Sequence, residues 1–132
     1  MPTENNIKFI SNPLLDNSEG KYVTVIIHVP LALESWRQSV FSYEWLKPDG
    51  AIKIMAELSQ GEQAKRKAVE ESVKLGRAIA QPVLGIGIMD NVEIGVGRAE
   101  FLTLAAKGLT RMPAHIPKSC ESDFKVFRAD IK

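Results

Sequence analysis

"VEIGVGRAEFLTLAAKGL", residues 92–109, changes from an extended to a helical pattern within one short run. Its first residues alternate as in a half-buried strand, whereas Phe101, Ala105 and Leu109 recur four apart, as on one face of a helix. Gly97 stands where the pattern changes and Gly108 where it ends, which predicts a strand, a glycine turn and a helix closed by glycine. A glycine turn that opens a helix is either scaffold or a place to hold phosphate, because unpaired backbone N–H groups point out of it.

The first half of the chain predicts a strand followed by a helix. Residues 22–29 are mostly β-branched and apolar, which indicates a central strand. A helix is expected to start at Pro30 and to end near Leu46, because apolar side chains recur every three or four residues. The sequence KPDG at 47–50 is typical of a turn, and residues 51–58 fit either a short helix or a strand.

The second half predicts one more helix and several strands around the opening segment. Ser59 starts a helix with capping-box spacing, and Gly76 ends it. Residues 81–89 are expected to form a strand that turns at Asp90 and Asn91 into the strand of the opening segment, as in a hairpin. Residues 111–117 predict a last strand, and their prolines favour an edge position.

These elements indicate a mixed α+β fold in which helices flank a small mixed sheet. Residues 1–20 are rich in polar residues and proline and are expected to form a loosely ordered arm. Residues 21–132 are expected to form one domain, whose tail at 123–132 adds a strand or a helix.

Composition excludes several classes of protein. The 132 residues are 45% hydrophobic and carry a net charge of +1, so no bulk charge attracts DNA. The single cysteine, Cys120, excludes an internal disulfide and a multi-cysteine zinc site, and no metal site is predicted. The N-terminus lacks the layout of a secretion signal, and no apolar run is long enough to cross a bilayer. We therefore expect a cytoplasmic protein without membrane insertion.

The glycine turn is the first candidate site. Gly95 and Gly97 allow close backbone approach, Arg98 offers a bidentate phosphate ligand, and Glu93 and Glu100 are candidate ligands of Mg²⁺. However, no GK[ST] follows the turn, and the third glycine of a dinucleotide-binding loop is absent. The pattern alone therefore favours a scaffold turn over a phosphate site.

The aromatic segment "ESWRQSVFSYEWL", residues 34–46, is the second candidate site. On the predicted helix, Trp36 and Tyr43 share one apolar face and are expected in the core, whereas Phe41 and Trp45 fall off it and are expected to be half-exposed. Half-exposed aromatic side chains are typical anchors for another protein. Core packing is the default interpretation, and the candidate partner-binding residues are Trp36, Arg37, Phe41 and Trp45.

No side chain is placed for nucleophilic or metal chemistry. His28 and His115 have no neighbouring cysteine, histidine or acid at ligand spacing, so both are expected to be structural. Cys120 lies alone in a polar stretch. No catalytic residue is predicted.

The order of these motifs resembles two known families. "AVEESVKLGRAIAQPVLGIG" and "GRAEFLTLAAKGLTRMPAHI", within residues 65–117, are similar to the ParB and sulfiredoxin-like domain, which implies that fold. With "IIHVPLALESWRQSVFSY" added, the chain resembles plasmid fertility-inhibition proteins of the oncogenic-suppressor type. This resemblance implies a cytoplasmic protein that blocks conjugative DNA transfer by binding the ATPase or coupling protein of a type IV secretion system.

The resemblance also implies an alternative, a nucleotide-binding or DNA-processing enzyme. Arg98 would then hold the phosphates of ATP or CTP, with Mg²⁺ beside it. Ala99 and Glu100 replace the histidine and the second arginine of the family turn, and the cysteine that sulfiredoxin chemistry needs is absent from it. Binding without catalysis is therefore the first expectation and an ATPase or nuclease the second.

Overall fold

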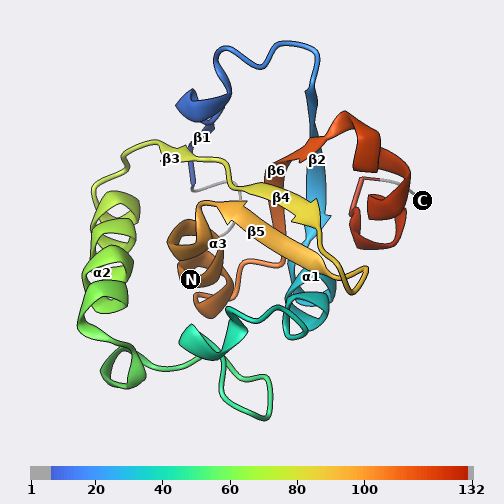
Figure 1. Ribbon diagram of the computed structural model, residues 1–132. Helices are drawn as coiled ribbons and strands as arrows, with labels where there is room; N and C mark the ends of the chain where they lie inside the picture. The colour runs from blue at the N-terminus through green and yellow to red at the C-terminus, as the bar shows by residue number, and fades with distance from the viewer. Residues whose placement is uncertain (1–6, 131–132) are drawn as a thin grey trace.

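A computed structural model describes residues 7–130, and its central part is a sheet with helices packed around it (Figure 1). The strands are β1 (Phe9–Ile10), β2 (Tyr22–His28), β3 (Ile79–Ala80), β4 (Val83–Ile86), β5 (Val92–Val96) and β6 (Arg111–Pro117). The α-helices are α1 (Val29–Trp36), α2 (Gln60–Lys74) and α3 (Arg98–Ala106). Short 3₁₀ segments are η2 (Pro13–Leu15), η3 (Ser42–Glu44), η4 (Met55–Glu57) and η5 (Lys118–Phe127).

The main sheet is mixed and has the strand order β2-β6-β4-β5. Strand β6 is antiparallel to β2 and parallel to β4, and β4 and β5 form an antiparallel hairpin. Strands β1 and β3 form a separate parallel pair. Helix α3 lies between the sheet and α2 (Figure 1). The predicted α+β class and the mixed sheet flanked by helices are confirmed.

The positions of two strands in the sheet are the reverse of the prediction. Strand β2 is an edge strand, and β6 lies inside the sheet. The chain beyond η5 covers the free edge of β2, because Ala129 N–H donates to the Ile26 carbonyl over 2.7 Å and Asp130 Oδ2 accepts from Ile26 N–H over 3.2 Å. The backbone N–H and carbonyl of Ile26 are therefore paired although β2 is an edge strand.

The prolines of β6 fit an internal strand because of where their nitrogens point. The N–H of His115 donates to the Pro82 carbonyl, on the side of β4. Nitrogens two residues apart point to the same side of a strand, so those of Pro113 and Pro117 also point away from β2. Only His115 of β6 pairs with β4, at Val83, so neither proline removes a hydrogen bond from the ladder with β2.

Helix α1 is shorter than predicted, which changes the burial of the aromatic segment. It starts as expected, with Pro30 in its first turn and the His28 side chain accepting from Leu31 N–H, but it ends at Trp36. The chain then continues through turns into η3. Tyr43 therefore leaves the expected core face and is 69% exposed.

Other elements follow the prediction more closely. Helix α2 is capped by Ser59 and ends before Gly76. The sequence KPDG at 47–50 forms the predicted turn, with Gly50 N–H donating to the Lys47 carbonyl. Residues 51–58 are neither a regular helix nor a long strand: Ile52 forms an isolated bridge with Leu46, and η4 follows. The predicted strand at 81–89 is reduced to β4. Of the predicted tail at 123–132, the part up to Phe127 belongs to η5, and residues 131–132 lie outside the described residues.

Part of the predicted N-terminal arm packs on the domain. Residues 1–6 of it lie outside the described residues. In the remainder, β1 pairs with β3, and Ile7 and Asn12 are buried. The core itself is formed mainly by α1, α3, β2 and β6, and its largest fully buried side chains include Trp36, Trp45, Phe101, Phe124 and Leu104.

Candidate functional site

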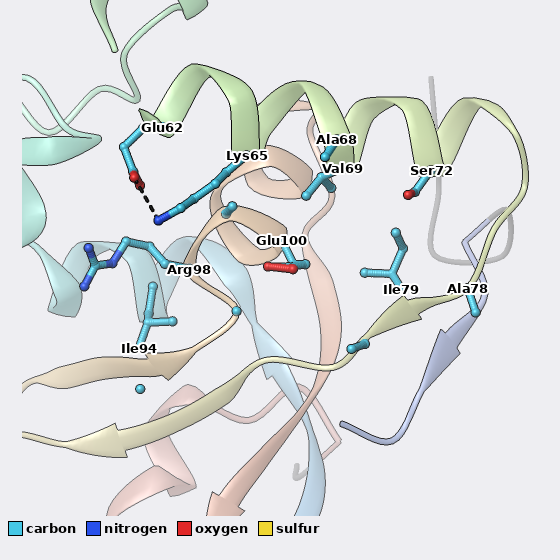
Figure 2. A pocket seen from close by; sticks show the side chains of 14 residues that line it. Glu62, Lys65, Ala68, Val69, Ser72, Ala78, Ile79, Ile94, Arg98 and Glu100 are labelled. Atoms are coloured by element: carbon cyan, nitrogen blue, oxygen red, sulfur yellow. Dashed lines mark ion pairs between the residues drawn. The ribbon is translucent and has the colours of Figure 1, made fainter. Parts of the chain in front are cut away.

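A cavity of about 610 Å³ lies between α2, α3 and the strands β3 and β5. Gly95, Gly97, Arg98 and Glu100, four of the five residues predicted to hold phosphate, line it. Helix α2 supplies the opposite wall with Glu62, Lys65, Ala68, Val69 and Ser72 (Figure 2). The four predicted residues thus line one wall of the cavity. The sequence did not indicate that α2 forms the opposite wall.

Gly97 forms the turn between β5 and α3, and its conformation requires glycine. Its φ of +83° is left-handed, and a Cβ there would lie 3.0 Å from Cα of Pro82. Its carbonyl accepts from Phe101 N–H over 2.9 Å and so begins α3. The first N–H groups of α3 consequently border the cavity.

The guanidinium of Arg98 points away from the middle of the cavity (Figure 2). Its Nη1 donates to Glu44 Oε1 over 2.8 Å. The same group lies over the rings of Phe41 and Trp36, with distances from Cζ to the ring centres of 5.0 and 5.8 Å. In this arrangement Arg98 joins the aromatic segment to α3, and its charge is balanced by Glu44.

Glu62 and Lys65 form an ion pair at one end of the cavity. Lys65 Nζ lies 3.1 Å from Glu62 Oε2, and Glu62 Oε1 accepts from the buried indole N–H of Trp45 over 2.8 Å. Burial raises the pKa of Glu62, but the hydrogen bonds from Trp45 and Lys65 and the charges of Lys65 and Arg98 outweigh it, so the pKa lies below its ordinary value. Glu62 is therefore ionised at neutral pH and neutralises Lys65.

Glu100 projects from α3 into the space facing α2 (Figure 2). It lies in the first turn of α3, where the helix dipole favours a negative charge. Within residues 7–130 its carboxylate takes part in no ion pair. The cavity thus contains two cations that are already paired and one carboxylate that is not.

Glu93 does not belong to this cavity, contrary to its predicted place in a phosphate or magnesium site. Its Oε1 accepts from Ser39 Oγ over 2.6 Å and its Oε2 from Asn91 Nδ2 over 3.0 Å. Asp90 is part of the hairpin turn, at a φ of +57°. In the described part of the chain no three His, Cys, Asp or Glu side chains are grouped so as to hold a metal ion.

The structure separates the predicted aromatic anchors. Trp36 is buried, as expected of the core, but Trp45 is buried too, and its predicted half-exposure is wrong because its indole lies beneath Arg66 and bonds to Glu62. Phe41 is 49% exposed. Arg37 is exposed and pairs with Glu34 at 3.0 Å.

Sequence reasoning missed Glu44, Glu62 and Lys65 as members of the site. One signal was visible at Glu62: its spacing from Ser59 is that of a capping box. In the structure Ser59 Oγ does accept from Glu62 N–H, over 3.4 Å, but the carboxylate of Glu62 bonds to Trp45 and Lys65. The i,i+3 spacing of Glu62 and Lys65 on α2 is a local signal for their ion pair, but no local pattern indicates the bond between Glu62 and Trp45.

Comparisons with protein-family models, with curated proteins and with solved structures find no match to this chain. No helix among the described residues is long and apolar enough to cross a membrane.

Proposed function

We propose that this protein acts by binding another protein through an exposed apolar patch between α1 and η3. The patch consists of Val40, Phe41 and Tyr43, which are 76%, 49% and 69% exposed. Three large apolar or aromatic side chains exposed within four consecutive residues make this segment a candidate contact site. This exposure is the observation on which the proposal depends.

Hydrogen bonds hold the backbone of the patch in place. Ser39 is buried, donates from Oγ to Glu93, and accepts at Oγ from the N–H of Phe41 over 3.2 Å. Ser42 Oγ donates to the Arg37 carbonyl over 3.0 Å. A loop ordered before binding loses less conformational entropy on binding, so these hydrogen bonds favour binding at the patch.

The class of partner comes from the sequence resemblance to fertility-inhibition proteins. We propose that the patch contacts the ATPase or the coupling protein of a type IV secretion system and thereby blocks conjugative transfer of plasmid DNA. The protein would act in the cytoplasm of the donor cell, and a ParB/sulfiredoxin-like fold is part of the same proposal. The pairing of Arg98 with Glu44 supports binding without catalysis, because it occupies the arginine that a phosphate needs.

A conjugation assay tests the proposal. Donor cells carrying a set of plasmids that use different secretion systems would express either the wild type or Val40→Ser/Tyr43→Ser. Wild type should lower transfer of at least one plasmid, and the double variant should restore it. Val126→Ser is the matched control, since Val126 is 69% exposed on η5, and it should inhibit as wild type does. Undiminished transfer of every plasmid would refute the function.

Nucleotide binding is the second candidate, and one observation favours it. The Nε of Arg98 is buried and has no acceptor among the described residues, as expected where an oxyanion binds. The other groups do not fit a nucleoside triphosphate: Lys65 and Arg98 are paired, and the carboxylate of Glu100 would repel the phosphates.

Titration with ATP and CTP, with and without Mg²⁺, separates the two candidates. We expect no change in melting temperature. A ligand at 100 times its Kd would stabilise the fold by about 2.7 kcal/mol. Stabilisation of that size, lost in Arg98→Ala, would replace protein binding by nucleotide binding as the preferred function.

A further inference from the structure

The cavity between α2 and α3 has the charge balance of a cation site. Lys65 is neutralised by Glu62 and Arg98 by Glu44, which leaves Glu100 as the one side chain of the lining whose charge is unbalanced within residues 7–130. Figure 2 shows Glu100 facing the space between α2 and β3, whereas Lys65 reaches toward Glu62 and Arg98 points outward. A positively charged group in the cavity would be attracted to this carboxylate.

Small apolar side chains line part of the cavity near Glu100, and Ser72 adds a hydroxyl from α2. Ala68 and Val69 line the cavity from α2, and Ala78, Ile79 and Ile94 line it from the strand side. Such side chains accept a chain of methylene groups. The volume of about 610 Å³ accommodates a short linear molecule without rearrangement of the helices.

We propose that this cavity binds a primary ammonium group carried on a short aliphatic chain, with the ammonium on the Glu100 carboxylate and the methylene groups against Val69 and Ile79. The ammonium would donate hydrogen bonds to the carboxylate, and hydrogen bonds between charged partners are stronger than those between neutral groups. Two sources share this chemistry, a free diamine and the side chain of a lysine in a partner protein. The site is separate from the patch of Val40, Phe41 and Tyr43.

Calorimetric titration with 1,4-diaminobutane and with Nα-acetyl-lysine amide tests the proposal and distinguishes the sources. Wild type should bind at least one of them, and the tighter of the two identifies the source. Glu100→Gln keeps the shape and removes the charge, so it should weaken binding about tenfold or more. Glu71→Gln is the matched control: Glu71 is exposed on the same helix as Lys65, outside the cavity lining, and its loss should leave binding unchanged.

A second variant, Lys65→Ala, should change amine affinity in the opposite direction to Glu100→Gln. Its removal leaves the Glu62 carboxylate without its ion pair, so amine binding should tighten, whereas an anion site would weaken. The proposal is overturned if neither amine binds wild type, if Glu100→Gln binds as wild type does, or if Lys65→Ala weakens the amine. It is equally overturned if ATP or hexanoate binds the cavity and the amines do not.

Discussion

The backbone N–H of Asn12 donates a hydrogen bond to Nε2 of His115 over 3.0 Å, and both residues are buried. Because Nε2 accepts, the imidazole is neutral and carries its proton on Nδ1, which donates to Thr24 Oγ1 over 3.1 Å. Asn12 Nδ2 also donates to the Gln81 carbonyl. His115 therefore fastens the N-terminal segment to the sheet, which is the structural role expected of it.

Acid should destabilise the fold through His115. Burial lowers its pKa below the ordinary value of 6.5. The unfolded chain then binds a proton at a pH where the folded chain does not, so stability is complete above pH 6.5 and falls as the pH drops from there toward the folded pKa. Urea denaturation between pH 7.5 and 5 measures this fall, which amounts to about 1.4 kcal/mol for each unit of displacement of the pKa.

The control is His115→Gln, which has no proton to bind in this range. Its stability at pH 7.5 should be lower than that of the wild type, and the fall between pH 6.5 and 5 should be smaller. An equal fall in both proteins would contradict the assignment to His115.

Removal of the Glu62 carboxylate should destabilise the junction of α2 and the aromatic segment. Glu62→Ala leaves the buried indole N–H of Trp45 without its acceptor, which costs about 1–3 kcal/mol. Glu62→Gln retains an acceptor and should cost less. Since the pKa of Glu62 lies below 4.5, its contribution is present above pH 4.5 and is lost as the pH falls through the folded value. Urea denaturation at pH 7 and pH 4 tests both statements.

Gly97→Ala should destabilise the turn by about 1–3 kcal/mol, because alanine is strained at positive φ and its Cβ would approach the backbone of Pro82. Gly61→Ala is the matched control. Gly61 lies in the first turn of α2, where no atom beyond its chain neighbours and its own helix backbone lies within 4 Å of an added Cβ, so alanine should be neutral or stabilise by up to about 1 kcal/mol. The melting temperature should therefore fall in Gly97→Ala and stay unchanged or rise in Gly61→Ala, and equal shifts would contradict the account of Gly97.

Local chemistry explains what the sequence predicted well. The turn at Gly97 and the helix end at Gly108 both have positive φ, which glycine adopts without strain, and the cap at Ser59 is an interaction within one turn. Contacts between distant segments explain what it missed. Helix α1 ends at Trp36, and Ser39, three residues beyond, is held by Glu93, 54 residues away.

The same distinction applies to the site. Gly95, Gly97, Arg98 and Glu100 are close in sequence, and their common cavity follows from one turn. The partner of Arg98 is Glu44, again 54 residues away, and no periodicity in either segment identifies it. Arg98, the predicted phosphate ligand, thus pairs with Glu44, which lies near it only in the folded chain.

Arg98 and Glu44 should be coupled in stability. Their side chains are 26% and 30% exposed, so solvent screens the pair and a double-mutant cycle of Arg98→Ala and Glu44→Ala should give a coupling energy of about 1 kcal/mol or less. Arg98→Ala alone should cost more than Glu44→Ala, because it also removes the contacts with the rings of Phe41 and Trp36. Since Phe41 belongs to the patch, Arg98→Ala should also weaken inhibition of conjugation at a temperature where the variant is fully folded. Full inhibition by Arg98→Ala would show that the patch is ordered without Arg98. The hydrogen bonds of Ser39 would then be sufficient to order it.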